Sequence, residues 1–114
     1  MYRATDLETG APVAIKKIHI SSPEIKMVLH REIRILQKVN HQNIIKLLGV
    51  FNDLNHGYLV FEYLPFDLIS YYKKVREKKN RNLGDSEITY IMYQIGQALS
   101  HMHGLGIMHR DIKP

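Results

Sequence analysis

The chain contains no cysteine, so it can form neither a disulfide nor a zinc site with thiolate ligands. It has no long apolar run either, and its hydrophobic stretches fall far short of the roughly 20 residues that cross a bilayer. No apolar segment of the secretory type follows Met1–Arg3. We therefore expect no disulfide framework, no membrane partner, and a location in the cytoplasm or nucleus.

Repeats and low-complexity tracts are also absent. A length of 114 residues is typical of one domain, and a hydrophobic content of 45% is enough for a core. The net charge of +5 favours an anionic partner, such as nucleotide phosphate, nucleic acid or an acidic peptide, without choosing among them. Residues 73–81 form the densest basic run. No aromatic residues interleave it at base-stacking spacing, so we interpret it as a solvated helix end and loop and expect no nucleic-acid partner.

Residues 1–20 read as two strands around a turn at 8–10, with Gly10 able to take positive φ. Strand alternation places Ala14, Lys16 and Ile18 on one face. Lys16, in the segment V-A-I-K, allows two interpretations. Either its aliphatic stem packs at the strand edge with the ammonium in water, or its ammonium binds a phosphate.

Residues 23–39 read as a helix, with Ser22 as N-cap. Its apolar stripe comprises Ile25, Val28, Leu29, Leu36 and Val39. Glu32 falls at the centre of that stripe, where an unpaired carboxylate is costly. Either Glu32 lies at the edge of the stripe and reaches water, or it faces the sheet and pairs with Lys16.

Two further strands are expected at 44–51 and 58–63, joined by a polar, Gly-containing hairpin. The pattern turns helical after Pro65, so we expect a boundary between residues 1–64 and 65–114, where ligand clefts are common.

A short helical stripe begins at Leu68, and a long helix follows, capped by Asp85 or Ser86. That helix is expected to end near His103, with Gly104 at C′. His101 and His103 are two positions apart on it, so they point to different sides, and we expect no metal site in this chain. A Gly-containing turn then leads to H-R-D at 109–111, where a carboxylate can accept a hydroxyl proton.

Taken together, these segments resemble a eukaryotic protein kinase of the serine/threonine type. V-A-I-K at 13–16 resembles the strand of the phosphate-binding lysine, and Glu32 its helix partner. H-R-D-I-K-P at 109–114 resembles the catalytic loop, with Lys113 similar to the serine/threonine version. Residues 59–64 and 91–95 are similar to the cyclin-dependent and mitogen-activated (CMGC) group.

The resemblance implies an α+β, protein-kinase-like fold: the antiparallel sheet of the small lobe, one packed helix, the hinge and the first helices of the large lobe. It implies ATP and Mg²⁺ as cofactors and a protein substrate. Asp111 would be the catalytic base and Lys113 would steady the γ-phosphate. The nucleotide would be bound by Ala14, Lys16, Glu32, Phe61, Glu62, Leu64 and Asp67.

The sequence also departs from the family pattern. By the resemblance, the Gly-rich loop would lie before residue 1, and the catalytic-loop Asn and D-F-G metal ligands after Pro114. We therefore expect an incomplete domain that is inactive alone. The segment before Glu32 lacks a P-S-T-A-I-R-E-type cyclin-contact sequence, which argues against dependence on a cyclin. A cyclin-like protein and another activating protein both stay open as the partner that the resemblance implies. The alternative function is a non-catalytic, truncated kinase-like or pseudokinase binding module.

Overall fold

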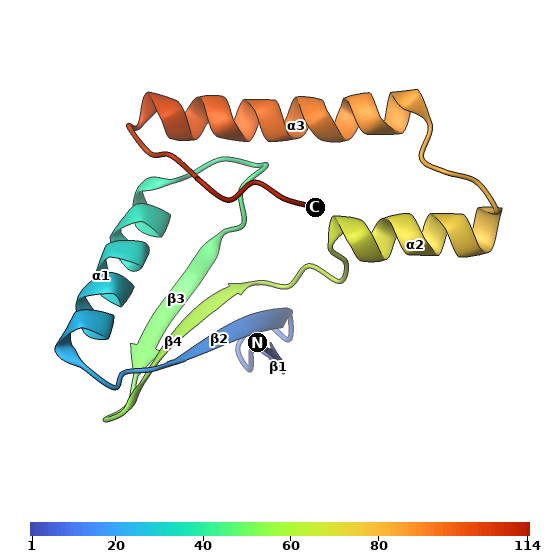
Figure 1. The fold of residues 1–114 in the computed structure, drawn as a ribbon. Helices are drawn as coiled ribbons and strands as arrows, with labels where there is room; N and C mark the ends of the chain where they lie inside the picture. The colour runs from blue at the N-terminus through green and yellow to red at the C-terminus, as the bar shows by residue number, and fades with distance from the viewer. The chain divides into compact units, whose positions relative to one another are not determined.

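The computed structural model describes residues 1–114, which fall into two compact units. The first unit comprises Met1–Asn40 and Ile44–Tyr63, and the second comprises His41–Asn43 and Leu64–Pro114. Figure 1 traces the chain through both units from its N-terminus to its C-terminus.

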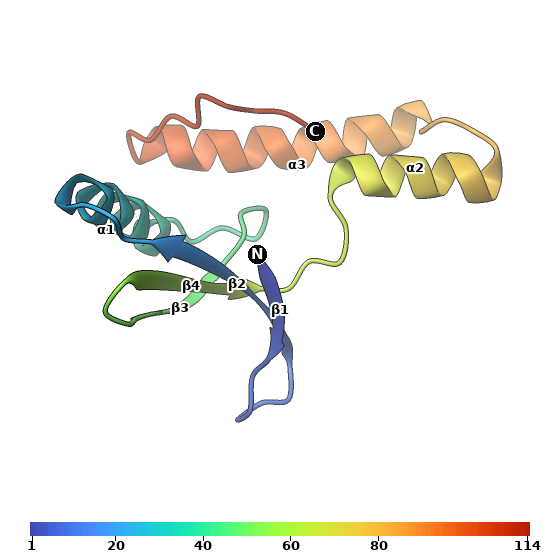
Figure 2. The ribbon, with the colours of Figure 1, turned by 60° about the horizontal axis from the view of Figure 1, so that its bottom comes forward.

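The first unit is a four-stranded sheet with one helix (Figures 1 and 2). Its elements are β1 (Tyr2–Thr5), β2 (Pro12–His19), α1 (Pro23–Lys38), β3 (Leu47–Asn52) and β4 (His56–Glu62). The strands lie in the order β1-β2-β4-β3, and every neighbouring pair is antiparallel. With the helices of the second unit, this confirms the predicted α+β, protein-kinase-like fold.

Helix α1 begins where its local sequence predicts. The Ser22 hydroxyl accepts a hydrogen bond from the Ile25 N–H at 3.4 Å, and Pro23 occupies the first turn, where no N–H is needed. The helix ends at Lys38, one residue earlier than predicted, because Val39 has extended backbone angles.

The core of the first unit joins α1 to one face of the sheet. Leu29 of α1 is buried with Leu59 and Phe61 of β4, and Ala14 and Ile18 pack against them. The face of β2 predicted from alternation is therefore the face turned to the helix.

The predicted apolar stripe of α1 was partly wrong. Val28 is 62% exposed, whereas Ile33, which the stripe omitted, packs against the core. Met27 and Ile35 are exposed as well, so α1 carries apolar residues on more than one side. Periodicity alone could not decide which of them face the sheet.

The strands predicted at 44–51 and 58–63 form with shifted ends. Strand β3 starts at Leu47, and just before it the Lys46 N–H donates a hydrogen bond to the side chain of Glu62 at 2.9 Å. A register irregularity lies between Leu47 and Gly49. The turn predicted at 8–10 is present, and Gly10 has φ +71°.

The second unit contains α2 (Leu68–Lys79) and α3 (Asp85–Gly104), followed by a segment without regular structure to Pro114. Asn80, in the left-handed conformation, ends α2. No helix of the chain combines the length and apolar content needed to cross a membrane.

Helix α3 ends within one residue of the predicted His103, but the cap residues predicted at its two ends are wrong. The N-cap is Gly84, not Asp85 or Ser86; its N–H donates to Glu87 Oε2 at 2.9 Å, so a carboxylate from inside the helix satisfies the cap. Gly104 lies inside the helix. Gly106 instead takes positive φ, +74°, because the helical hydrogen bonds continue to the Leu105 N–H.

Candidate functional site

Two of the predicted site residues form an ion pair in the first unit. Lys16 Nζ on β2 lies 2.7 Å from Glu32 Oε1 on α1. The predicted contact between strand and helix is therefore confirmed, and Glu32 is not simply a carboxylate at the edge of the stripe. The two side chains are 40% and 37% exposed, so the pair stays accessible to a ligand.

The surroundings of this pair explain its geometry. Lys16 stands opposite Leu59 in the β2–β4 register, and Glu32 follows Leu29 by one turn of α1. Since Leu29 and Leu59 belong to the core, the backbones that carry the pair are held by packing. A half-exposed pair contributes only about 0–1 kcal/mol to stability, so its main effect is to fix the position of the ammonium.

Ala14 and Phe61 face each other in the same sheet. They are direct partners in the β2–β4 register, and cross-strand partners share a face. Phe61 is buried in the core cluster and Ala14 packs against that cluster. Lys16 lies two residues along β2 from Ala14, so these candidate side chains and the ammonium lie on one side of the sheet.

Glu62, at the end of β4, is held by Lys46. Its carboxylate accepts the Lys46 N–H at 2.9 Å, and its own N–H donates to the Lys46 carbonyl at 3.2 Å. The side chain of Glu62 is thus engaged within the protein. Leu64 belongs to the second unit, is exposed and lies outside the helices and strands.

Asp67 is the N-cap of α2, a structural role that we did not predict. Its Oδ1 accepts the Ser70 N–H at 2.6 Å, and hydrogen bonds to Ser70 hold the pKa of this carboxyl below its usual value. The run Asp67-Leu68-Ile69-Ser70, a capping residue before a helical stripe, could have shown this role.

The two predicted catalytic residues lie together in the second unit. Lys113 Nζ is 3.1 Å from Asp111 Oδ2, and both side chains are 71% exposed. The Asp111 N–H donates to His109 Nδ1 at 3.1 Å, while Arg110 between them has φ +68°. A non-glycine residue in this region is uncommon and strained, and such residues cluster at functional sites.

The segment His41–Asn43, which precedes β3, belongs to the second unit. Asn43 Nδ2 donates to Gln94 Oε1 on α3 at 3.2 Å, and the rings of His41 and His101 lie 5.1 Å apart. Sequence reasoning missed this anchor because the partners are 51 positions apart and no local pattern links them.

The comparisons with known proteins agree with the motifs and the fold. The family model for the protein kinase domain matches residues 1–114. The chain belongs to the protein kinase family. It is 39% identical to Cell division control protein 2 homolog 3 of Trypanosoma brucei brucei, with all of this chain and 36% of the relative covered. Relatives of this kind support the predicted likeness to the cyclin-dependent and mitogen-activated kinases.

Two more relatives extend this picture. Serine/threonine-protein kinase ICK of Rattus norvegicus is 42% identical over 95% of this chain and 17% of its own length. Mitogen-activated protein kinase 12 of Homo sapiens is 36% identical over 97% of this chain and 31% of its own length. The chain thus spans about a third or less of these kinases.

The residues of this kinase chain fit the two cofactors of the family unequally. A cationic ammonium held by a carboxylate, as in Lys16 and Glu32, suits the phosphates of ATP. No group of three or more His, Cys, Asp or Glu side chains could hold a metal ion. Lys16 is therefore the candidate for contact with phosphate in this chain.

Proposed function

We propose that this chain supplies the phosphate-binding and proton-accepting residues of a protein kinase that transfers the ATP γ-phosphate to Ser or Thr of a protein. The observation that carries the proposal is the Lys16–Glu32 ion pair at 2.7 Å. In it the motif lysine and the helix glutamate, 16 positions apart, are in contact. This contact supports the proposal, because protein kinases need such a pair in place for phosphoryl transfer.

In this proposal each residue of the first unit has a separate task. Lys16 donates hydrogen bonds to the α- and β-phosphates, because an ammonium has three donors and Glu32 occupies one of them. Ala14 and Phe61 form an apolar surface for the adenine ring. The backbone carbonyl of Glu62, rather than its engaged side chain, is the group proposed to contact the adenine edge.

The second unit would supply the remaining contacts to ATP and the residues that take part in phosphate transfer. The Leu64 N–H is proposed to bind the adenine edge, and the carboxylate of Asp67 the ribose. Asp111 would accept the proton of the substrate hydroxyl, and Lys113 would steady the transferring phosphate. The present contact between Lys113 and Asp111 supports this division, because it keeps the ammonium within reach of the reacting groups.

Magnesium would be held by residues outside this chain, and it would neutralise charge on the transferring phosphate when bound. We propose a protein substrate and an activating partner, cyclin-like or of another type, in the cytoplasm or nucleus.

A kinase assay of a longer polypeptide that contains this chain, with the Gly-rich and D-F-G segments, tests the proposal. With Mg-ATP and a protein substrate, we expect phosphoserine and phosphothreonine. Asp111→Asn should lower the rate by about 100-fold or more. The matched control Asp85→Asn, at the start of α3, should leave it unchanged. A polypeptide that binds ATP without transferring phosphate would overturn the proposal in favour of the non-catalytic module.

A further inference from the structure

Two histidines face each other across strands β2 and β4, at the end of β2 that leads to α1. His19 and His56 are direct partners in the β2–β4 register, and cross-strand partners share a face of the sheet. Ile18 packs against the core beneath α1, so the next residue along β2, His19, points to the opposite face. The histidine pair therefore lies on the face of the sheet that α1 does not cover.

The backbone hydrogen bonds show that this is a pair in which the side chains come close. The Ile20 N–H donates to the Asn55 carbonyl at 2.8 Å, and these two residues are the next pair along the same register. Hydrogen-bonded and non-hydrogen-bonded pairs alternate along an antiparallel ladder, and side chains lie closer in the second kind. The pair of His19 and His56 is of that second kind, and the centres of its rings are 5.1 Å apart.

This separation suits two ring nitrogens that bind one metal ion. A histidine nitrogen lies about 2.0–2.1 Å from Zn²⁺, which is almost always tetrahedral in structural sites. Two imidazole rings that share an ion in this geometry have centres roughly 5 Å apart. His19 is exposed and the His56 side chain is 26% exposed, so an ion can reach both rings from solvent.

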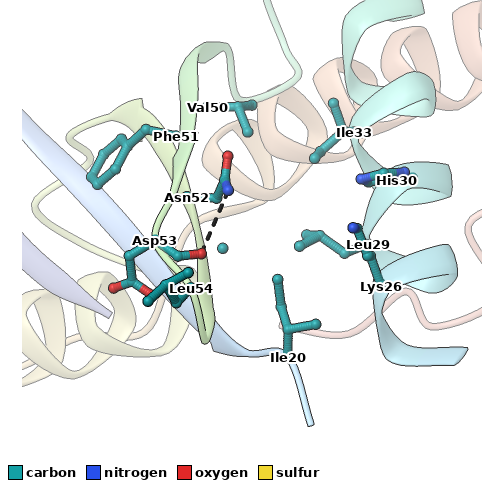
Figure 3. Close-up of a pocket in the computed structure, with 11 residues that line it drawn as sticks. Ile20, Lys26, Leu29, His30, Ile33, Val50, Phe51, Asn52, Asp53 and Leu54 are labelled. Atoms are coloured by element: carbon teal, nitrogen blue, oxygen red, sulfur yellow. Dashed lines mark hydrogen bonds between the residues drawn. The ribbon is translucent and has the colours of Figure 1, made fainter. Parts of the chain in front are cut away.

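Asp53, in the turn between β3 and β4, holds one ring nitrogen of His56. Its Oδ1 lies 3.2 Å from His56 Nδ1 and also accepts the Asn55 N–H, while its Oδ2 accepts the Tyr58 hydroxyl. An ionised carboxylate only accepts hydrogen bonds, so His56 Nδ1 carries the hydrogen and Nε2 keeps the lone pair. Figure 3 shows the Asp53 side chain on the side of the turn away from α1. Metal-binding histidines are ordinarily held by a carboxylate in this way.

The other close histidine pair of the chain lacks these features. The rings of His41 and His101 also lie 5.1 Å apart. However, His41 Nδ1 accepts the Asn43 N–H at 3.0 Å, so its lone pair is already used within the protein. The Nε2 atom of His101 is buried, and neither ring has a carboxylate partner. An exposed position and an orienting carboxylate therefore distinguish His19 and His56.

We propose that His19 and His56 bind a Zn²⁺ ion across strands β2 and β4, with Nε2 as the ligand atom of His56 and Asp53 as its orienting partner. No three His, Cys, Asp or Glu side chains could hold an ion together, so water would complete the coordination. Imidazole suits zinc, whereas magnesium prefers oxygen ligands, so this site is separate from the magnesium of phosphate transfer. The inference does not rest on the proposed kinase function.

The first test is a calorimetric titration of Zn²⁺ into the chain, prepared without a histidine tag. We expect one saturable site per chain, and EDTA should reverse the binding. His19→Gln and His56→Gln should each raise Kd at least about tenfold, because each removes one of the two protein ligands. The matched control His30→Gln, at an exposed histidine of α1, should change Kd less than about twofold.

Asp53→Asn tests the orienting partner separately from the ligands. The Asn side-chain oxygen can still accept the N–H groups of the turn, but the negative charge beside His56 is lost. We expect Kd to rise about 10- to 100-fold. Asp6→Asn is the matched control, because Asp6 accepts the Glu8 N–H at 2.9 Å in the turn between β1 and β2, and it should leave Kd unchanged.

Electron paramagnetic resonance with Cu²⁺, which also takes imidazole ligands, counts the bound nitrogens and does not depend on stability. We expect two nitrogens in the parent chain and one in each of His19→Gln and His56→Gln. Neither histidine belongs to the core, so these variants should fold, and circular dichroism checks that they do.

Three results would overturn the proposal. The first is absence of saturable Zn²⁺ binding to the folded chain. The second is an unchanged Kd or nitrogen count in His19→Gln or His56→Gln, which would place the ion elsewhere. The third is one ion for every two chains with a dimer in sedimentation, which would show that the ion joins two copies rather than two strands.

Discussion

Lys16 and Glu32 form the only ion pair that joins the sheet of the first unit to α1, with Nζ and Oε1 2.7 Å apart. Because both side chains are more than a third exposed, the pair adds little to stability. Its main effect is to hold the ammonium of Lys16 in one position. A rotation of α1 would separate the carboxylate from the ammonium and leave Lys16 free to take other rotamers.

The first prediction concerns Lys16 itself. In a longer polypeptide with the complete kinase domain, Lys16→Met should lower kcat/KM for ATP by about 100-fold or more. The free energy of unfolding should change by less than about 1 kcal/mol. The control is Lys17→Met, on the opposite face of β2, where the ammonium lies over the Tyr58 ring. Equal losses from both variants would contradict the assignment.

The second prediction is that the 114 residues alone transfer no phosphate. Phosphoryl transfer needs a metal to neutralise developing charge, and this chain has no cluster of residues that could hold one. Incubation of the purified chain with labelled ATP and Mg²⁺ should give no incorporation above that of Asp111→Asn. Autophosphorylation that depends on Mg²⁺ and on Asp111 would refute the prediction.

The third prediction separates the two roles assigned to Asp67. Serine caps helices about as well as aspartate, but its side chain is shorter and uncharged. In the longer polypeptide, Asp67→Ser should therefore keep the stability while raising KM for ATP several-fold. Asp67→Ala should also lose about 1 kcal/mol of stability, since the hydrogen bond to the Ser70 N–H disappears. Unchanged KM in both variants would leave Asp67 a helix cap only.

The fourth prediction uses Gly57. Gly57→Ala brings a methyl group within 2.5 Å of Leu29 Cδ2, and Leu29 is buried against Leu59 and Phe61. We expect a loss of about 1–2 kcal/mol in urea unfolding. The matched control Gly49→Ala adds a methyl group with nothing within 4 Å, so it should be nearly neutral. Equal effects would show that strand propensity, not crowding, is measured.

The fifth prediction concerns pH. Hydrogen bonds from Arg81 first, and then from the Gly84 N–H, lower the pKa of Glu87 from 4.5 to about 2. The folded chain thus binds this proton less readily than the unfolded chain does. The stabilisation is fully present above about pH 5 and is lost as the pH falls towards 2.

Glu87→Gln removes this titration. In thermal melts followed by circular dichroism, the variant should have a lower Tm at pH 7, and its difference from the parent should shrink between about pH 5 and pH 2. Glu77→Gln is the control, because Glu77 of α2 makes no side-chain hydrogen bond or ion pair. A constant difference across this range would contradict the assignment to Glu87.

Much of the candidate site could be predicted from the sequence, because the patterns that place its residues are local. Strand alternation placed Ala14 and Lys16 on one face, and the position of Glu32 among apolar neighbours pointed it toward that face. The Lys113–Asp111 contact was not predicted, although the two residues lie only two positions apart. It depends on the path of an irregular segment, in which Arg110 has positive φ, and no periodicity describes such a path.

The amino-acid sequence by itself determined which segments are helices and strands, where α1 begins at Ser22, and which family the chain belongs to. Helices and strands depend on capping and periodicity, which act over a few neighbouring residues, whereas the family follows from the order of motifs along the chain. Only the tertiary structure decided that Ile33 faces the core while Val28 faces solvent, and that Asn43 bonds Gln94. Those outcomes depend on packing and hydrogen bonding between residues distant in sequence, which local pattern does not encode.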